Sequence, residues 1–141
     1  MNSAIMMLEK TAARFPDRVA VQEEGGEMTF SGLRSAGMSI AAALLDFDKF
    51  TAEPEAQTPV IVYMRKSIAA LAVFTGAMYA GHPYVPLDFD MPVNRVQSIV
   101  GNIKEGYIVS LEADIERLAE LDLCEMRLVS YESLIAGQAD E

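Results

Sequence analysis

The chain has 141 residues, of which 51% are hydrophobic and 23% charged, and its formal net charge is −10. This length corresponds to one domain or a piece of one, and the composition is ordinary for a globular protein. The acidic balance argues against nucleic acid and anionic membrane surfaces as partners, because both attract clustered lysine and arginine.

The first half of the chain predicts two amphipathic helices separated by a hairpin. Each helix begins at a serine, Ser3 or Ser31, whose hydroxyl can accept a hydrogen bond from the first turn. A Gly-Gly pair at 25–26 lies between two short apolar runs and predicts the turn of the hairpin. The expected elements are a helix over residues 3–15, strands over 19–22 and 28–30, a helix from 31 to 47–50, and a loop over 51–59.

The second half alternates β-branched runs with helical segments. The run 59–64 has no polar alternation, which is typical of a strand buried on both faces of a parallel sheet. Ser67 and Gly81 fit the caps of the helix between them, and Gly106 is expected to end the following helix. The expected strands cover 59–64, 84–87, 107–110 and 126–129, and the expected helices cover 67–80, 92–104, 112–121 and 131–136.

This alternation predicts an α/β fold in three layers, with a mostly parallel sheet, flanking helices and the small N-terminal hairpin. The helix over 67–80 is apolar nearly all round, so it is either central in a larger protein or covered by a missing partner. One interpretation of the chain is therefore a stand-alone α/β interaction module that docks through helix 67–80.

Few residues are candidates for chemistry. The one histidine, His82, lies between Gly81 and a proline and is expected to be a surface or locally bonded group. The one cysteine, Cys124, has acidic neighbours that disfavour a reactive thiolate, and it is expected to be a small buried residue. Neither a metal-ligand spacing nor a glycine-rich phosphate loop occurs in the sequence. We therefore predict no catalytic, cofactor-binding or metal-binding residue in this chain.

Two carboxylates follow strand 84–87, where side chains of α/β proteins often act. Asp88 as a phosphoacceptor or magnesium ligand would make the chain a regulatory domain. The favoured interpretation is that Asp88 and Asp90 cap the helix that starts at Pro92, and that Arg95 pairs with one of them. Arg65 and the lysine after it are expected to be a solvated loop.

Three segments resemble parts of one enzyme family. Residues 80–95 resemble Ala-Gly-x-x-Tyr-Val-Pro-Leu/Ile-Asp followed by Pro and Arg, as in amino-acid adenylation domains. Residues 28–33 resemble Leu-Thr-Tyr-x-Glu-Leu, and 15–21 resemble the opening strand. Their order is that of the adenylate-forming (AMP-binding) ligases. Gly81-His82 and residues 95–99 look most similar to D-alanine–carrier protein ligases.

The resemblance implies that residues 1–141 are an N-terminal, incomplete portion of the large adenylation subdomain. Such ligases use ATP and magnesium to activate a carboxylic acid, here expected to be an amino acid, and pass it to the thiol of a carrier protein or coenzyme A. Their phosphate loop, acyl pocket and catalytic lysine lie later in the chain. We therefore expect this chain to be inactive alone, to partner with the remainder of the adenylation domain, and to be cytoplasmic, since it begins with no secretory signal.

Overall fold

The computed structural model describes residues 3–48, 58–103, 105–118, 121–123 and 125–135. The elements in chain order are α1 (Ser3–Arg14), β1 (Val19–Glu23), β2 (Gly26–Thr29), α2 (Phe30–Asp48), β3 (Val60–Tyr63), α3 (Ile68–Ala80), β4 (Tyr84–Leu87), α4 (Val93–Ile103), β5 (Glu105–Ser110), the 3₁₀ turn η1 (Glu112–Arg117), β6 (Glu125–Ser130) and α5 (Tyr131–Ile135). Most of the expected loop, residues 51–57, lies outside the described residues, as does Cys124.

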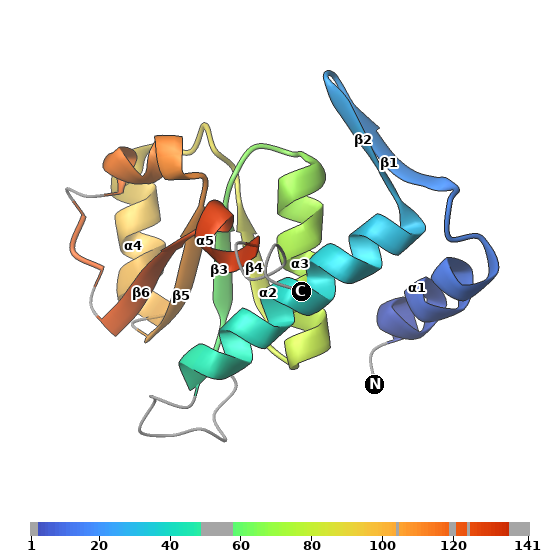
Figure 1. Ribbon diagram of the computed structural model, residues 1–141. Coiled ribbons are helices and arrows are strands. Elements are labelled where there is room, and N and C mark those ends of the chain that lie inside the picture. Colours follow the sequence, from blue (N-terminus) through green and yellow to red (C-terminus); the bar gives the residue numbers. More distant parts are fainter. Residues whose placement is uncertain (1–2, 49–57, 104, 119–120, 124, 136–141) are drawn as a thin grey trace.

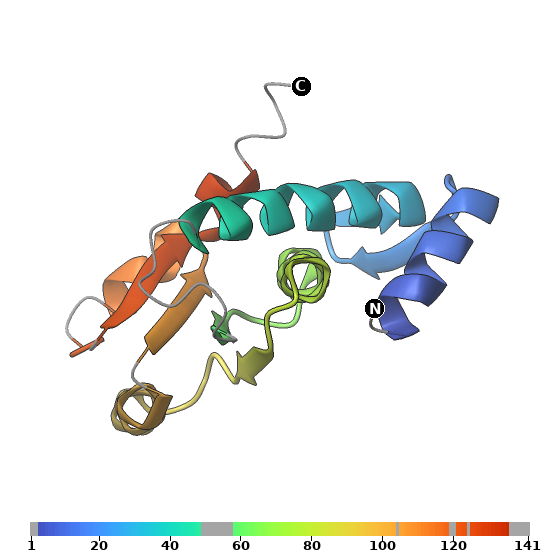
Figure 2. The same cartoon turned by 90° about the horizontal axis from the view of Figure 1, so that it is seen from below.

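The described strands form a four-stranded sheet and a separate hairpin (Figure 1). The sheet has the order β4-β3-β5-β6, and all of its neighbouring strands are parallel. Strands β1 and β2 pair antiparallel in the hairpin. Helices α2 and α3 lie on one face of the sheet and α4 on the other (Figure 2). The predicted three-layer α/β fold with an N-terminal hairpin is therefore confirmed.

Strand β3 separates two hydrophobic cores. Its four residues are each no more than 1% exposed, as expected for a strand buried on both faces. Val60 and Val62 belong to the core beneath α2, α3 and α5. Ile61 and Tyr63 belong to the core beneath α4. The alternation along one strand therefore joins the three layers.

Helix α3 is held at both ends as the sequence predicts. The Ser67 hydroxyl accepts a hydrogen bond from the Ala70 N–H at 3.1 Å, and Gly81 takes the left-handed conformation with φ of 80°. No residue of α3 is exposed, and Ala72, Val73 and others of its side chains are buried. The helix is thus central in the chain, and it offers no open apolar face for the docking module considered above.

Two expectations about element ends and one about the type of a helix are wrong. The hydroxyl of Thr29, rather than that of Ser31, caps α2, because it accepts the Gly32 N–H at 3.0 Å. Gly106 does not end a helix but lies in β5 with φ of +150°. A Cβ there would lie 2.4 Å from the Pro59 carbonyl oxygen, so the close approach of two backbones requires glycine.

The third concerns the segment after β5. Residues Glu112–Arg117 form the 3₁₀ turn η1 in place of the first part of the expected helix over 112–121, of which residues 119–120 lie outside the described residues. The Leu118 N–H donates to the Ile115 carbonyl, three residues back, and the Asp114 N–H donates to the Leu111 carbonyl in the same way. Hydrogen bonds between residues three apart define a 3₁₀ helix, which is more tightly wound than an α-helix.

Glycines bring α2 and α3 close together. A Cβ at Gly76 would lie 2.4 Å from Cγ2 of Ile40, and a Cβ at Gly37 would lie 2.6 Å from Cγ2 of Thr75. Both distances are shorter than ordinary contacts, and Ile40 is fully buried. The two helices therefore pack at a distance that only glycine permits at these positions.

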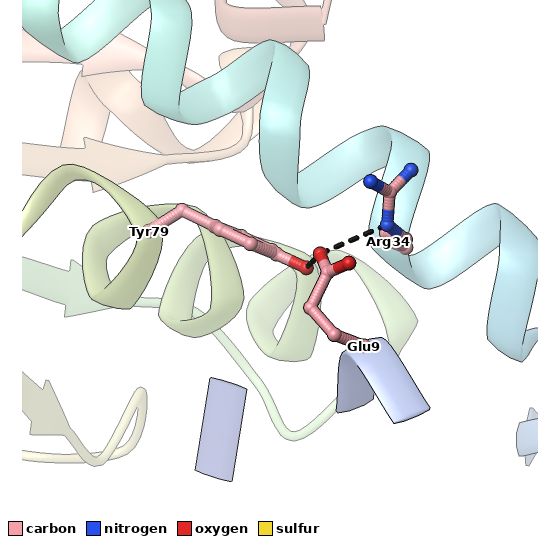
Figure 3. Close-up of polar contacts among 3 residues, drawn as sticks. All are labelled: Glu9, Arg34 and Tyr79. Atoms are coloured by element: carbon pink, nitrogen blue, oxygen red, sulfur yellow. Dashed lines mark hydrogen bonds and ion pairs between the residues drawn. The ribbon is translucent and has the colours of Figure 1, made fainter. Parts of the chain in front are cut away.

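A polar cluster ties α1 to both of these helices. Oε1 of Glu9 accepts hydrogen bonds from Nε of Arg34 on α2, at 2.9 Å, and from the hydroxyl of Tyr79 on α3. Figure 3 shows both donors directed at this one carboxylate. The bonds from Tyr79 and Arg34 lower the pKa of Glu9, whereas burial, with the bond to Glu9, raises the pKa of Tyr79 to about 12.

Replacement of Gly76 by alanine tests the close helix contact. We expect Gly76→Ala to lower the free energy of unfolding by ~1–3 kcal/mol, because the new methyl group overlaps Ile40. Gly101→Ala in α4 is the matched control, since a Cβ there meets no atom within 4 Å. It should raise stability by ~0.5–1 kcal/mol through helix propensity. Urea unfolding followed by circular dichroism measures both, and equal effects of the two changes would refute the close packing.

The pH dependence of stability tests the Glu9 cluster. Because the folded-state pKa of Glu9 lies below its ordinary value of 4.5, the cluster stabilises the fold above that pH and loses this effect as the pH falls through the folded pKa. At neutral pH the free energy of unfolding of the unaltered chain should exceed that of Glu9→Gln by about 1 kcal/mol or less, since the Glu9 side chain is 35% exposed. This difference should vanish in acid. Glu24→Gln, in the exposed hairpin turn, is the control. An advantage over Glu9→Gln that persists in acid would contradict the assignment.

Candidate functional site

A cavity of about 490 Å³ opens at the carboxyl ends of β3 and β4, beside the start of α3. Its size falls within the range of small-molecule pockets, ~300–1,000 Å³. It has an apolar floor and a charged rim. The lining residues include Val62, Met64, Phe74 and Leu87 on the floor, and Arg65, Lys66, Asp88 and Asp90 on the rim.

The strand order places a topological switch point next to this cavity. The chain passes from β3 to β4 on one side and then returns to β5 on the other side of β3. Open α/β sheets bind ligands outside the carboxyl ends of strands at such points. The segments that follow β3 and β5 are therefore the first place to look for functional side chains.

Phe89 occupies this end of the sheet. It is 5% exposed, its ring lies 5.1 Å from that of Tyr63, and its carbonyl accepts the Tyr63 hydroxyl at 3.2 Å. The guanidinium carbons of Arg65 and Arg117 each lie 4.3 Å from the centre of the Phe89 ring. Two cations from the two segments flanking the switch point thus pack on one aromatic ring, an arrangement that sequence spacing did not reveal.

The acids that follow β4 do not act as predicted. Oδ1 of Asp88 accepts the Asp90 N–H at 2.9 Å, which closes a local turn, so it does not cap α4. The Pro92 carbonyl accepts the N–H groups of Arg95 and Val96, the third and fourth residues of that helix. Oδ1 of Asp90 lies 3.9 Å from Nη1 of Arg65. Asp90 therefore pairs with Arg65, while Arg95 is exposed on α4, and the predicted pairing with Arg95 is wrong.

These carboxylates give little support to a phosphoacceptor role. The side chains of Arg65 and Asp90 are 68% and 81% exposed, and such a pair contributes little to stability or to an organised site. Within residues 3–48, 58–103, 105–118, 121–123 and 125–135, His, Cys, Asp and Glu nowhere form a group of three or more able to hold a metal ion. The regulatory interpretation of Asp88 therefore lacks an ion site in that part of the chain.

His82 has a structural environment. It is 7% exposed, Nδ1 lies 2.7 Å from the Thr58 carbonyl oxygen, and its ring meets that of Tyr107 edge-on at 5.8 Å. These contacts anchor the chain just after α3 to the segment before β3. The expectation of a bonded histidine is confirmed, although it is buried rather than on the surface.

The pKa of Tyr79 in the Glu9–Arg34–Tyr79 cluster is raised to about 12, yet the role of the cluster is structural. The hydrogen bonds lower the pKa of Glu9, so this carboxylate is a poorer base than an ordinary one. Tyr79 stands near the end of α3, whereas the cavity is lined by Ala70 and Phe74 nearer its start. The cluster therefore joins three helices and does not extend the cavity.

The fold is shared with solved structures of adenylate-forming enzymes. The fatty acid AMP ligase from Legionella pneumophila matches with a TM-score of 0.76 at 19% identity, over 96% of this chain and 24% of that chain. The N-terminal subdomain of Klebsiella oxytoca NpsA matches with a TM-score of 0.75 at 19% identity, over 94% of this chain and 32% of that one. These identities establish the fold alone.

Sequence relatives point the same way. A nonribosomal peptide synthetase, vlms, from Lecanicillium sp is 35% identical over 117 residues, which are 83% of this chain and 1% of that protein. A D-alanine–D-alanyl carrier protein ligase from Bacillus cereus (strain G9842) is 28% identical over 128 residues, or 91% of this chain and 23% of the ligase. The chain thus spans less than a quarter of the length of either relative.

A family model covers nearly the whole chain. Residues 8–138 match the model described as AMP-binding enzyme. The predicted resemblance to the N-terminal part of an adenylate-forming ligase is confirmed by this match, by the relatives and by the shared fold. None of the helices described is both long and apolar enough to cross a membrane.

Because the family model matches residues 8–138, the chain belongs to the AMP-binding enzyme family.

Proposed function

We propose that this chain is an N-terminal structural portion of the acid-activating domain of an ATP-dependent adenylate-forming ligase. The observation that carries the proposal is the family match over residues 8–138. Relatives named as a D-alanine–D-alanyl carrier protein ligase and a peptide synthetase support an amino acid as the activated acid. The name of the ligase also supports a carrier protein as the acceptor. Coenzyme A is the alternative acceptor thiol.

We infer that the residues the structure describes contribute no complete site for ATP or magnesium. The sequence contains no glycine-rich phosphate loop, and the end of the sheet is packed by Phe89 with Arg65 and Arg117. The rim charges of Arg65 and Asp90 face each other and partly neutralise one another. The chain's contribution is therefore a rigid three-layer support, and the remainder of the adenylation domain, as its partner, would supply the groups that bind nucleotide and acid.

The stand-alone interaction module is a weaker candidate. Its expected docking surface is the apolar helix 67–80, yet residues Ile68–Ala80 of α3 are all buried or half-buried within this chain. An interface through α3 would require the chain to open its own core.

ATP–pyrophosphate exchange by the purified chain tests its inactivity. We expect no exchange above background with D-alanine or other amino acids, and no change of melting temperature with millimolar ATP and magnesium. The Bacillus cereus D-alanyl carrier protein ligase in the same assay is the positive control. ATP–pyrophosphate exchange that depends on an added amino acid would contradict the proposal.

A chimera tests the structural role. Residues 8–138 of this chain should replace the matching segment of the Bacillus cereus ligase and give a folded enzyme with the acid preference of the recipient. This result is expected because the transferred segment positions later elements without touching substrate. A switch of acid preference in the chimera would show that this segment carries specificity and would contradict the proposal.

A further inference from the structure

Helix α1 lies apart from the four-stranded sheet. Both ribbon views show it at the hairpin end of α2, on the side of the molecule away from β5 and β6 (Figure 1, Figure 2). Its main contacts are with α2 and α3. A movement of α1 would therefore leave every strand pair of the β4-β3-β5-β6 sheet intact.

The segment directly after α1 is tied to the start of α2 by the backbone. The Ser31 N–H donates to the Pro16 carbonyl at 3.1 Å, and the Phe30 N–H donates to the Arg18 carbonyl at 3.0 Å. Pro16 lacks a backbone N–H and does not continue the helix. Residues 16–18 are therefore a fixed point about which α1 can turn.

Side chains hold α1 against α2 and α3. Ile5 and Ala12 are buried, at 1% and 6% exposure. Between them, one carboxylate oxygen, Oε1 of Glu9, accepts hydrogen bonds from both Arg34 of α2 and Tyr79 of α3 (Figure 3). Because both bonds end on the same charged group, neutralisation of Glu9 weakens the two of them together.

We propose that α1 opens as a unit about residues 16–18 while the sheet stays folded, and that the Glu9 cluster holds it closed. On the outward side of α1, Met6 and Met7 are already 48% and 69% exposed, so the opening exposes little additional apolar surface. It would uncover the part of α2 and α3 that lies beneath Ile5 and Ala12. The chain thus carries a separable N-terminal arm that is controlled by the charge of one carboxylate.

The groups that face Glu9 set the direction of the pH dependence. Tyr79 comes from α3 and Arg34 from α2, whereas Lys10 and Arg14 of α1 itself are exposed. In the closed position, the hydrogen bonds from Tyr79 and Arg34 lower the pKa of Glu9 below its ordinary value of 4.5. The cluster therefore holds α1 closed above that pH, and this effect is lost as the pH falls through the lowered pKa.

Hydrogen exchange of the full chain at low urea concentrations tests the separate opening. We expect the amides of α1 to exchange together, and at least about tenfold faster than those of β3. Their rates should depend little on urea, because urea favours an opening in proportion to the surface that the opening exposes. Exchange of α1 and β3 at one rate with one urea dependence would overturn the proposal. So would α1 amides that exchange as fast as those of an unfolded peptide.

Substitutions in the Glu9 cluster test what holds α1 closed. Glu9→Gln and Tyr79→Phe should each speed the exchange of α1 amides by about twofold to fivefold, the effect of an exposed charged pair. Tyr79 lies on α3, so its replacement leaves the intrinsic exchange rates of α1 unaltered. The matched controls are Glu24→Gln in the exposed hairpin turn and Tyr131→Phe on α5, which should leave α1 exchange unchanged. Equal effects in the cluster variants and their controls would also overturn the proposal.

A pH series tests the role of the carboxylate. In the unaltered chain, the protection of α1 amides, corrected for intrinsic exchange rates, should fall as the pH drops through the lowered pKa of Glu9. The fall should be smaller in Glu9→Gln, which has no charge to lose at this position. A fall of the same size in both chains would assign the acid sensitivity to another group and would contradict the role of Glu9.

Discussion

Burial of β3 on both of its faces is the constraint on which the rest of the fold depends. A fully buried valine or isoleucine side chain contributes ~1.5–3 kcal/mol, so a strand with no polar position must be covered by helices on both sides and by strands at both edges. Register then explains the proline in β4. Val60 lies opposite Tyr84 and donates to the Pro83 carbonyl, so the backbone of Pro86 points away from the sheet. The missing N–H costs no ladder bond and discourages a further strand at that edge.

The second constraint is the short distance between α2 and α3. A helix that is apolar on every side needs partners on every side, and α3 finds them in the sheet, in α2 and in α1. Gly37 and Gly76 allow the two helices to approach more closely than any residue with a Cβ would permit. The polar cluster of Glu9, Arg34 and Tyr79 then fixes α1 at the exposed end of this packing. Hydrophobic packing thus determines the distance, while the hydrogen bonds determine the orientation.

The features predictable from sequence were those that depend on near neighbours. The Ser67 cap, the Gly81 cap and the unalternating strand before them each follow from a few adjacent residues, as does the hairpin. Two of the errors arose where a distant contact decides. Glycine is required at position 106 because the Pro59 carbonyl oxygen lies close to it, and no local pattern reveals this contact. Arg65 takes the position near Asp90 that Arg95 was expected to take, because the parallel pairing of β3 and β4 brings their carboxyl ends together.

The segment that carries the family resemblance is, in this chain, a set of structural devices. Gly81 ends a helix, His82 bonds the chain before β3, Pro86 closes an edge, and Asp88 forms a turn. Phe89 then covers the end of the sheet with two arginines on its ring, where α/β proteins commonly place ligands. A family motif can therefore persist because a fold needs it. Since Phe89 and two arginines pack together at the switch point of this sheet, the geometry favours chemistry built from segments other than this one.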